Sequence, residues 1–259
     1  MSQQQPGESP WSRAPFEHWW SWIRLVTAIP HFNRTGQVGD GREAAVRDHV
    51  LAHATAGAPE SVLAAVDAFA RGRRTLVAVG DEKGLILDAV VRRVQPKLAL
   101  ELGTYCGYSA IRTARLLPPG SRLVSVEFSA ANAEIARTLI AHAGLSDRVT
   151  VVVGTLGDGG TTIRTLTDEH GFAPGEVDFV FIDHIKDAYL SDQRLMLSAD
   201  WLHQGSTVLA DNIKFPGVPD YRKYMRTTEG SAWRTTWHRT HVEYQSMVSD
   251  LMLESEYLG

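Results

Sequence analysis

Short apolar segments alternate with helix-forming segments through the middle of the chain, and this alternation constrains the fold more than any other feature. Strand and helix alternating in this way are typical of a parallel sheet with helices on both faces, so we predict a Rossmann-like α/β fold. The expected strands are 97–102, 122–127, 149–153, 177–182 and 206–211, with an antiparallel end at 234–241 and 244–253. The expected helices are 43–55, 60–72, 82–94, 107–117, 129–143, 161–170 and 187–202.

The composition fits one α/β domain and argues against nucleic acid as a partner. With 259 residues and 44% hydrophobic content, the chain can build one sizeable core, which we place at 41–259. The formal net charge is −4, and no arginine-rich strip indicates a nucleic-acid surface. Cys106 is the only cysteine, which excludes an internal disulfide and favours a cytoplasmic protein.

Residues 1–40 form an N-terminal extension with a different composition. A polar start is followed by a tryptophan-rich segment at 11–32 and a linker-like stretch at 33–41. Charged residues and a proline interrupt the apolar run, so it predicts neither a transmembrane helix nor a signal peptide. Two interpretations stay open: packing against the domain's own surface, and peripheral contact with a membrane or a partner.

The segment LALELGTYCGYS predicts a strand, a glycine turn and a helix that together bind a nucleoside-like ligand. Gly103 and Gly107 allow a sharp turn and close approach of the backbone, and Ser109 begins a segment with free N–H groups. The spacing is G-x-x-x-G. The dinucleotide fingerprint G-x-G-x-x-G is absent, which disfavours a nicotinamide or flavin cofactor.

Two glutamates indicate which chemical groups this ligand carries. Glu127 ends the second strand, where a carboxylate can accept both hydroxyls of a ribose. Glu101 lies inside the first strand, and a buried charge there needs a partner such as a cationic ligand or backbone donors. S-adenosylmethionine has a ribose, an ammonium and a sulfonium but no phosphate, so it fits this turn.

Ligand-type residues also follow two later strands. Asp183 comes directly after the expected strand 177–182, and Asp211 and Asn212 end the next one. The carboxyl ends of neighbouring parallel strands meet at one edge of a sheet, and three oxygen ligands there suit Mg²⁺. Lys186 would stand on the same rim as a candidate general base. Alone, Asp211 and Asn212 would more simply make a turn, so the prediction depends on the whole cluster.

The motifs resemble those of the Mg²⁺-dependent catechol O-methyltransferases over about residues 40–255. The resemblance is carried by VGDEKG (79–84), LELGTYCGYSAIRTARLLPPGSRL (100–123), FIDHIKDAYL (181–190), LADNIKFPGVPD (209–220) and HVEY (241–244). It implies seven strands with the last one antiparallel. It also implies transfer of a methyl group in line from S-adenosylmethionine to one hydroxyl of a Mg²⁺-chelated catechol.

The resemblance also implies a role for each matching residue. Lys186 would be the general base, Glu243 would bind the second hydroxyl, and Pro216 would form one wall of the substrate site. The metal ligands would be Asp183, Asp211 and Asn212, the last also touching substrate. The cofactor residues would be Val79, Glu101, Gly103, Tyr105, Ser109, Glu127, Phe128, Asp183 and His184.

Departures from the family pattern leave the acceptor open. Thr75 stands where the mammalian enzymes have a tryptophan over the catechol ring, and Ile185 replaces the tryptophan of the DHxK segment. The stretch 154–162 lacks the family's Ser-Gln pair at the adenine edge.

Three hypotheses for the function remain. The first is a catechol O-methyltransferase, and the second is a metal-dependent methyltransferase for another bidentate acceptor, such as a hydroxamate, a caffeoyl-type ester or a natural product. The third is a non-catalytic binding protein. A monomer and a homodimer are both compatible with the sequence.

Overall fold

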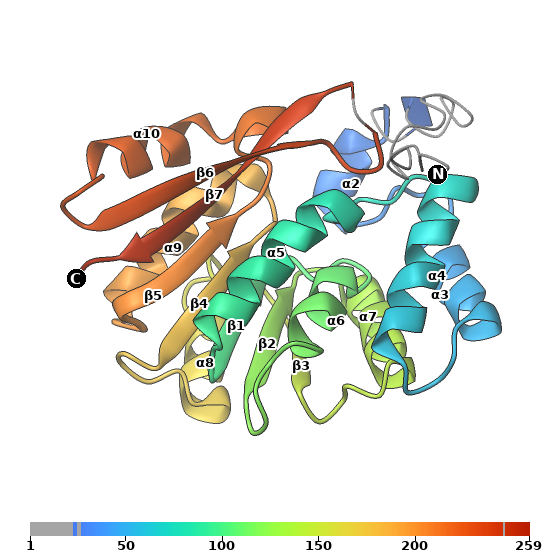
Figure 1. Ribbon diagram of the computed structural model, residues 1–259, viewed down its shortest axis with the longest axis horizontal. Helices are drawn as coiled ribbons and strands as arrows, with labels where there is room; N and C mark the ends of the chain where they lie inside the picture. The colour runs from blue at the N-terminus through green and yellow to red at the C-terminus, as the bar shows by residue number, and fades with distance from the viewer. Residues whose placement is uncertain (1–22, 25–26, 246) are drawn as a thin grey trace, which may run out of the picture.

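The computed structural model describes residues 23–24, 27–245 and 247–259, and these form a seven-stranded sheet between two layers of helices (Figure 1). The strands are β1 (Leu98–Leu102), β2 (Arg122–Glu127), β3 (Val149–Val153), β4 (Val177–Ile182), β5 (Leu202–Ala210), β6 (Trp233–His241) and β7 (Ser249–Tyr257). Their order across the sheet is β3-β2-β1-β4-β5-β7-β6. Strands β1 to β5 pair in parallel, and β7 runs antiparallel to both of its neighbours. The predicted α/β fold with an antiparallel last strand is confirmed.

The helices cover both faces of the sheet because the parallel strands are apolar on both sides. Alternate residues of β1 point to opposite layers, with Ala99 in one core and Leu98 and Leu100 in the other. The helices are α2 (Ile29–Thr35), α3 (Arg42–His53), α4 (Pro59–Gly72), α5 (Gly80–Val94), α6 (Tyr108–Ala114), α7 (Ala130–His142), α8 (Thr161–His170), α9 (Tyr189–Ser198) and α10 (Pro219–Thr227). Helices α3 to α7 supply the first core, and α8 to α10 supply the second.

The register of the strands aligns their carboxyl ends. Leu102 of β1 pairs with Ile182 of β4, and Ile182 pairs with Ala210 of β5. The residues that follow these three strands therefore leave the sheet at the same edge. This edge is where parallel α/β sheets bind their ligands.

The expected last strand at 244–253 is wrong, since β7 spans Ser249–Tyr257. The amide of Val242 donates to the carbonyl of Val248 over 2.9 Å and closes a loop between β6 and β7. Tyr244 in this loop has a positive φ of 55°, which a strand does not allow. The HVEY segment therefore runs from the end of β6 into a loop. Helices α2 and α10, which are 7 and 9 residues long, were not expected either.

The N-terminal extension is only partly described. Its four tryptophans lie outside the described residues. The stretch 33–41 packs onto the domain, because Asn132 of α7 donates to the carbonyl of Gly36 over 2.7 Å and Asp40 pairs with Arg42 at 2.9 Å. In the part of the chain that the structure describes, no helix is long and apolar enough to cross a bilayer.

Gly103 joins β1 to the following turn at a point where no side chain fits. Its φ is +100°, and an added Cβ would lie 2.3 Å from the carbonyl oxygen of Asp183, at the end of β4.

We predict that Gly103→Ala lowers the free energy of unfolding by more than the roughly 1–2 kcal/mol that a left-handed conformation costs an alanine. Gly205→Ala is the matched control, since Gly205 has φ +96° with open space around it. Chemical denaturation of both variants checks this, and equal losses would contradict the steric argument.

Candidate active site

Glu101 is fully buried within β1 and only half of its carboxylate is bonded. The hydroxyl of Ser125 donates to its Oε1 over 2.9 Å, whereas its Oε2 has no partner among the described residues. Burial raises the pKa of Glu101 to about 8, against the lowering effect of hydrogen bonds from the Ser125 and Ser109 hydroxyls. The unpaired oxygen is suited to a cationic or hydrogen-bond-donating ligand above the glycine turn.

Glu127 ends β2 one strand away, with its carboxylate held in place by the backbone. The amide of Tyr105 donates to Oε2 over 2.8 Å, and the amide of Ser129 donates to Oε1 over 2.9 Å. Burial raises the pKa of Glu127, while hydrogen bonds from these amides, from the Thr104 amide and from the Asn132 side chain oppose the shift. The carboxylate of Glu127 is therefore fixed in place at the end of β2.

The remaining residues predicted to hold the cofactor lie around these two glutamates or at the same edge. The phenol of Tyr105 donates to Glu43 Oε1 over 2.9 Å, and Ser109 is buried in the first turn of α6. Val79 is buried at the start of α5, and Phe128 follows β2 beside Gly36. These placements are compatible with the predicted roles.

His184 follows Asp183 at the end of β4 and has one free ring nitrogen. Its Nε2 lies 2.9 Å from Asp192 Oδ2, and its ring stacks on Tyr189 at a centroid distance of 5.1 Å. Its buried Nδ1 has no partner in the described residues. A nitrogen left in this state is available to a ligand at the strand ends.

Lys186 stands beside the first predicted metal ligand. Its Nζ donates to Asp183 Oδ1 over 2.8 Å and to the phenol oxygen of Tyr189 over 2.9 Å. Both Lys186 and Asp183 are partly exposed, with side-chain exposures of 22% and 19%. The amine is therefore accessible to an acceptor that approaches from solvent.

Asp211 follows β5 and is fully buried among other charges. Burial raises its pKa to about 7. The charges of Asp183 and Glu243 raise this pKa further, whereas the charge of Lys83 lowers it. Its neighbour Asn212 adopts a positive φ of 55° and donates its side-chain amide to Glu243 Oε1 over 3.3 Å. Asp183, Asp211, Asn212 and Glu243 thus gather at one edge of the sheet, as the sequence predicts.

A buried lysine of α5 contacts this group. Lys83 Nζ lies 2.8 Å from Asp211 Oδ1, 2.7 Å from Glu243 Oε1 and 2.8 Å from Asp250 Oδ2. Burial alone would lower the pKa of Lys83, but the three carboxylates raise it well above its usual range. Lys83 is therefore a fixed positive charge at this edge.

Asp250, at the start of β7, connects the charged group to the predicted substrate wall. It accepts the side-chain amide of Asn212 at Oδ2 over 3.1 Å. Its Oδ1 accepts the backbone amides of Lys214 and Phe215 over 3.1 and 2.9 Å. The next peptide bond, from Phe215 to the exposed Pro216, is cis. The position of Pro216 thus depends on Asp250.

The charges around this edge fit a divalent cation. With every group ionised, the four carboxylates of Asp183, Asp211, Glu243 and Asp250 exceed the two lysine ammonium groups by two negative charges. In the described residues no group of three or more His, Cys, Asp or Glu side chains is arranged to hold a metal ion. The predicted set has two carboxylates and one amide, and such oxygen donors suit Mg²⁺ or Mn²⁺.

Lys83 and Asp250 were not among the site residues expected from the sequence. A signal for Lys83 was available, because it shares a helical stripe with the buried Leu87, Val90 and Val91 of α5. A lysine on such a stripe needs a buried partner. Asp250 gave no comparable signal, because its partners are distant in sequence.

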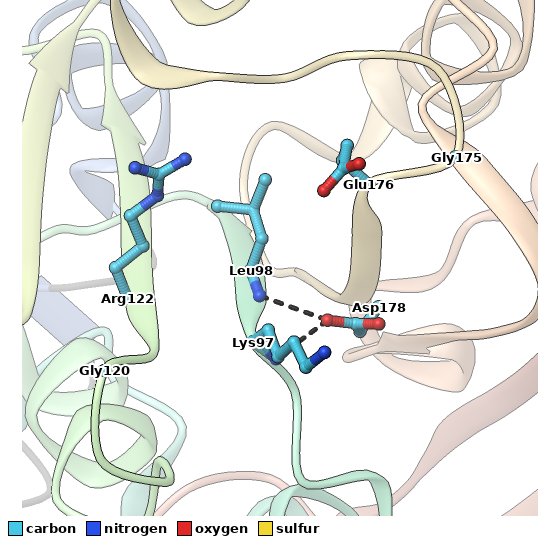
Figure 2. Close-up of a pocket in the computed structure, with 7 residues that line it drawn as sticks. All are labelled: Lys97, Leu98, Gly120, Arg122, Gly175, Glu176 and Asp178. Atoms are coloured by element: carbon cyan, nitrogen blue, oxygen red, sulfur yellow. Dashed lines mark hydrogen bonds between the residues drawn. The ribbon is translucent and has the colours of Figure 1, made fainter.

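A separate depression of about 370 Å³ lies at the opposite ends of the strands (Figure 2). It is lined by Lys97, Leu98, Gly120, Arg122, Gly175, Glu176 and Asp178. Asp178 Oδ2 accepts the backbone amides of Lys97 and Leu98 over 2.7 and 3.1 Å, so that carboxylate is used within the fold. None of the predicted site residues lies here.

Comparison with known proteins agrees with this geometry. Residues 59–224 match the O-methyltransferase family. This chain is a member of that family. A probable O-methyltransferase of Mycobacterium tuberculosis is 57% identical over 235 residues, covering 91% of this chain and all of that protein.

Two further relatives extend the comparison. Catechol O-methyltransferase B of Danio rerio is 46% identical over 210 residues, covering 81% of this O-methyltransferase and 76% of the relative. TomG, an O-methyltransferase of Streptomyces achromogenes involved in tomaymycin synthesis, was solved in complex with S-adenosylmethionine. It has a TM-score of 0.61 and 27% identity, with 76% of this chain and 89% of TomG covered. The predicted resemblance to catechol O-methyltransferases is confirmed.

The buried Glu101 makes the stability of this O-methyltransferase depend on pH. Because its pKa is raised from 4.5 to about 8 in the fold, the folded state binds more protons than the unfolded state between these values. The free energy of unfolding of the ligand-free protein should therefore fall as pH rises through this window. Glu101→Gln should reduce the fall by a few kcal/mol, although Asp211 contributes a similar effect. Denaturation at pH 5 and pH 8.5 checks this, and an unchanged slope in the variant would contradict it.

Proposed function

We propose that this O-methyltransferase moves the methyl group of S-adenosylmethionine to one hydroxyl of a catechol held by Mg²⁺. The observation that carries the proposal is the gathering of Asp183, Asp211, Asn212, Lys186 and Glu243 at the carboxyl ends of β4 and β5 and in the β6–β7 loop. The unbonded oxygen of Glu101 lies at the end of the neighbouring β1. Similarity to catechol O-methyltransferases supports the proposed acceptor, and similarity to TomG, solved with S-adenosylmethionine, supports the proposed cofactor.

The cofactor half would bind S-adenosylmethionine by charge and hydrogen bonding. Glu127, fixed by two backbone amides, would accept the ribose hydroxyls. Glu101 would pair with the positive charge of the ligand, which offsets the cost of its burial. Ser109 and the turn from Gly103 would lie along the methionine end, and His184 would contribute its free ring nitrogen.

The metal half would hold Mg²⁺ through Asp183, Asp211 and Asn212. When bound, Mg²⁺ orients two adjacent oxygens and stabilises the phenolate form of one of them. The residues present fit a divalent cation, since with every group ionised the four carboxylates exceed the two lysine ammonium groups by two negative charges.

In its neutral amine form, Lys186 would take the proton from the hydroxyl that receives the methyl group and become an ammonium. Its Nζ stands 2.8 Å from Asp183, so the amine and the proposed metal ligand share one approach to the acceptor. Glu243 would accept a hydrogen bond from the second hydroxyl, and Pro216 would limit the tilt of the ring. Fixing the acceptor oxygen behind the methyl carbon lowers the barrier, by up to about 7–11 kcal/mol in well-oriented systems.

We predict that Lys186→Met reduces kcat by about 10²–10⁴-fold with little change in KM, because a general base acts mainly in the transition state. The measurement is methyl transfer from S-adenosylmethionine to catechols and mono-phenols, with Mg²⁺ or with EDTA. Lys223→Met on α10 is the matched control, since Lys223 is exposed. Turnover should require Mg²⁺ and a vicinal diol.

Two outcomes would contradict this proposal. Methylation of mono-phenols in EDTA would exclude the chelated mechanism. Binding of S-adenosylmethionine without turnover on any acceptor would favour the non-catalytic alternative.

The rim of the site favours acceptors larger than catechol itself. Three apolar side chains on the segments that carry Lys186, Pro216 and Glu243 are exposed: Ile185 by 39%, Phe215 by 48% and Met247 by 66%. Such side chains can pack against an apolar substituent on the ring. This observation keeps a larger natural product as a second candidate acceptor.

We predict that catechols with a bulky apolar substituent have a KM several-fold below that of catechol. Phe215→Ala should remove most of this preference while leaving kcat for catechol unchanged. Steady-state kinetics with a substituent series measures this. A preference for catechol itself in the wild type would contradict the prediction.

A further inference from the structure

Lys83 is the most deeply buried lysine of this chain. Its side chain is 1% exposed, and its three N–H donors face three carboxylates at 2.7 to 2.8 Å. These carboxylates come from the end of β5, the β6–β7 loop and β7, whereas Lys83 belongs to α5. The ammonium group of Lys83 thus connects α5 to three other segments of the chain.

The three partners of Lys83 have different roles in the proposed site. Asp211 would bind the metal, Glu243 would bind the second hydroxyl, and Asp250 fixes the backbone that leads to Pro216. Three like charges within reach of one point repel one another strongly in a buried place. The ammonium of Lys83 lies within 2.8 Å of all three and offsets this repulsion.

We propose that Lys83 is a positioning residue that sets the orientations of Asp211 and Glu243, and so the affinities for the metal and for the second hydroxyl. This inference rests on the proposed function. Lys83 touches neither the metal nor the acceptor in this scheme, and it acts only through the carboxylates that do.

A lysine suits this role better than an arginine. Its ammonium is a compact charge with three donors that point in different directions, as the three separate carboxylates require. A guanidinium presents its donors in one plane and fits a single carboxylate from the side. Lys83→Arg is therefore expected to keep the charge and recover only part of the function.

The first test measures Mn²⁺ binding to the full-length protein by calorimetry or electron paramagnetic resonance, which needs no turnover. We expect Lys83→Met to weaken Mn²⁺ binding by about 10–100-fold, the usual effect of losing a group that orients a metal ligand. KM for the catechol should rise as well. Binding of S-adenosylmethionine should change less than twofold, because Glu101 and Glu127 do not contact Lys83. Lys83→Arg should fall between Lys83→Met and the wild type.

Val91→Ala is the control for lost stability. Val91 is fully buried two turns further along α5 and makes no polar contact with the site. If its melting temperature falls and its Mn²⁺ affinity is retained, instability alone does not weaken the metal site. Wild-type Mn²⁺ affinity in Lys83→Met, or equal loss of metal and cofactor binding, would overturn the proposal.

A second measurement on the wild type applies even if Lys83→Met does not fold. The chain has five lysines, Lys83, Lys97, Lys186, Lys214 and Lys223, of which only Lys83 is buried. In protein labelled with ¹⁵N-lysine, its ammonium should exchange slowly and give a resolved signal. That signal should shift during Mg²⁺ titration with the same Kd as the metal. Saturation with Mg²⁺ without a shift would overturn the proposal.

These outcomes separate the inference from the proposed function. A wild type that neither binds Mg²⁺ nor methylates catechols refutes the proposed function. A wild type that does both, with Lys83→Met binding metal as tightly, refutes the role of Lys83 alone.

Discussion

Repulsion among buried carboxylates is the constraint on which the proposed ligand-binding edge depends. Asp211 and Asp250 are buried beside Glu243, and Asp183 lies close enough to raise the pKa of Asp211. Isolated charges in such a place would cost several kcal/mol each. Lys83 offsets part of this cost by contacting three of them. With every group ionised, an excess of negative charge remains, and this favours a cation at the edge.

Because of the same burial, two carboxyl groups bind a proton more tightly in the ligand-free folded chain than in the unfolded chain. Glu101 and Asp211 both have raised pKa values, to about 8 and about 7, so each is bound to a proton more readily in the folded chain than in the unfolded one. Their ionised forms destabilise the fold when no partner is present. A cationic ligand at either group reverses this penalty. Ligand binding and folding stability are therefore linked through these two carboxyl groups.

The sequence predicted the parts of this structure that depend on local pattern. Alternating segments predicted β1 to β5 within a few residues, and residues directly after a strand were correctly expected at one edge, as Asp183 and Asp211 are. The last strand was misplaced because the loop that carries Glu243 has the composition of a strand. Lys83 was missed because it is 128 residues from Asp211 and 167 from Asp250. Contacts between elements so distant in sequence follow from the assembled fold and leave little local trace.

The turn after β1 and the end of β4 approach closely at Gly103, beside the strand pairing of Leu102 with Ile182. Gly103 follows β1, which carries Glu101, and Asp183 follows β4, and any Cβ at Gly103 would overlap the carbonyl of Asp183. Methyl transfer requires donor and acceptor atoms about 3–3.5 Å apart in line, and displacements of about 1 Å can cost two orders of magnitude in rate. A side chain at this position would push the β1 turn away from the end of β4. The absence of a side chain at Gly103 thus allows the close approach that the proposed transfer between cofactor and acceptor would require.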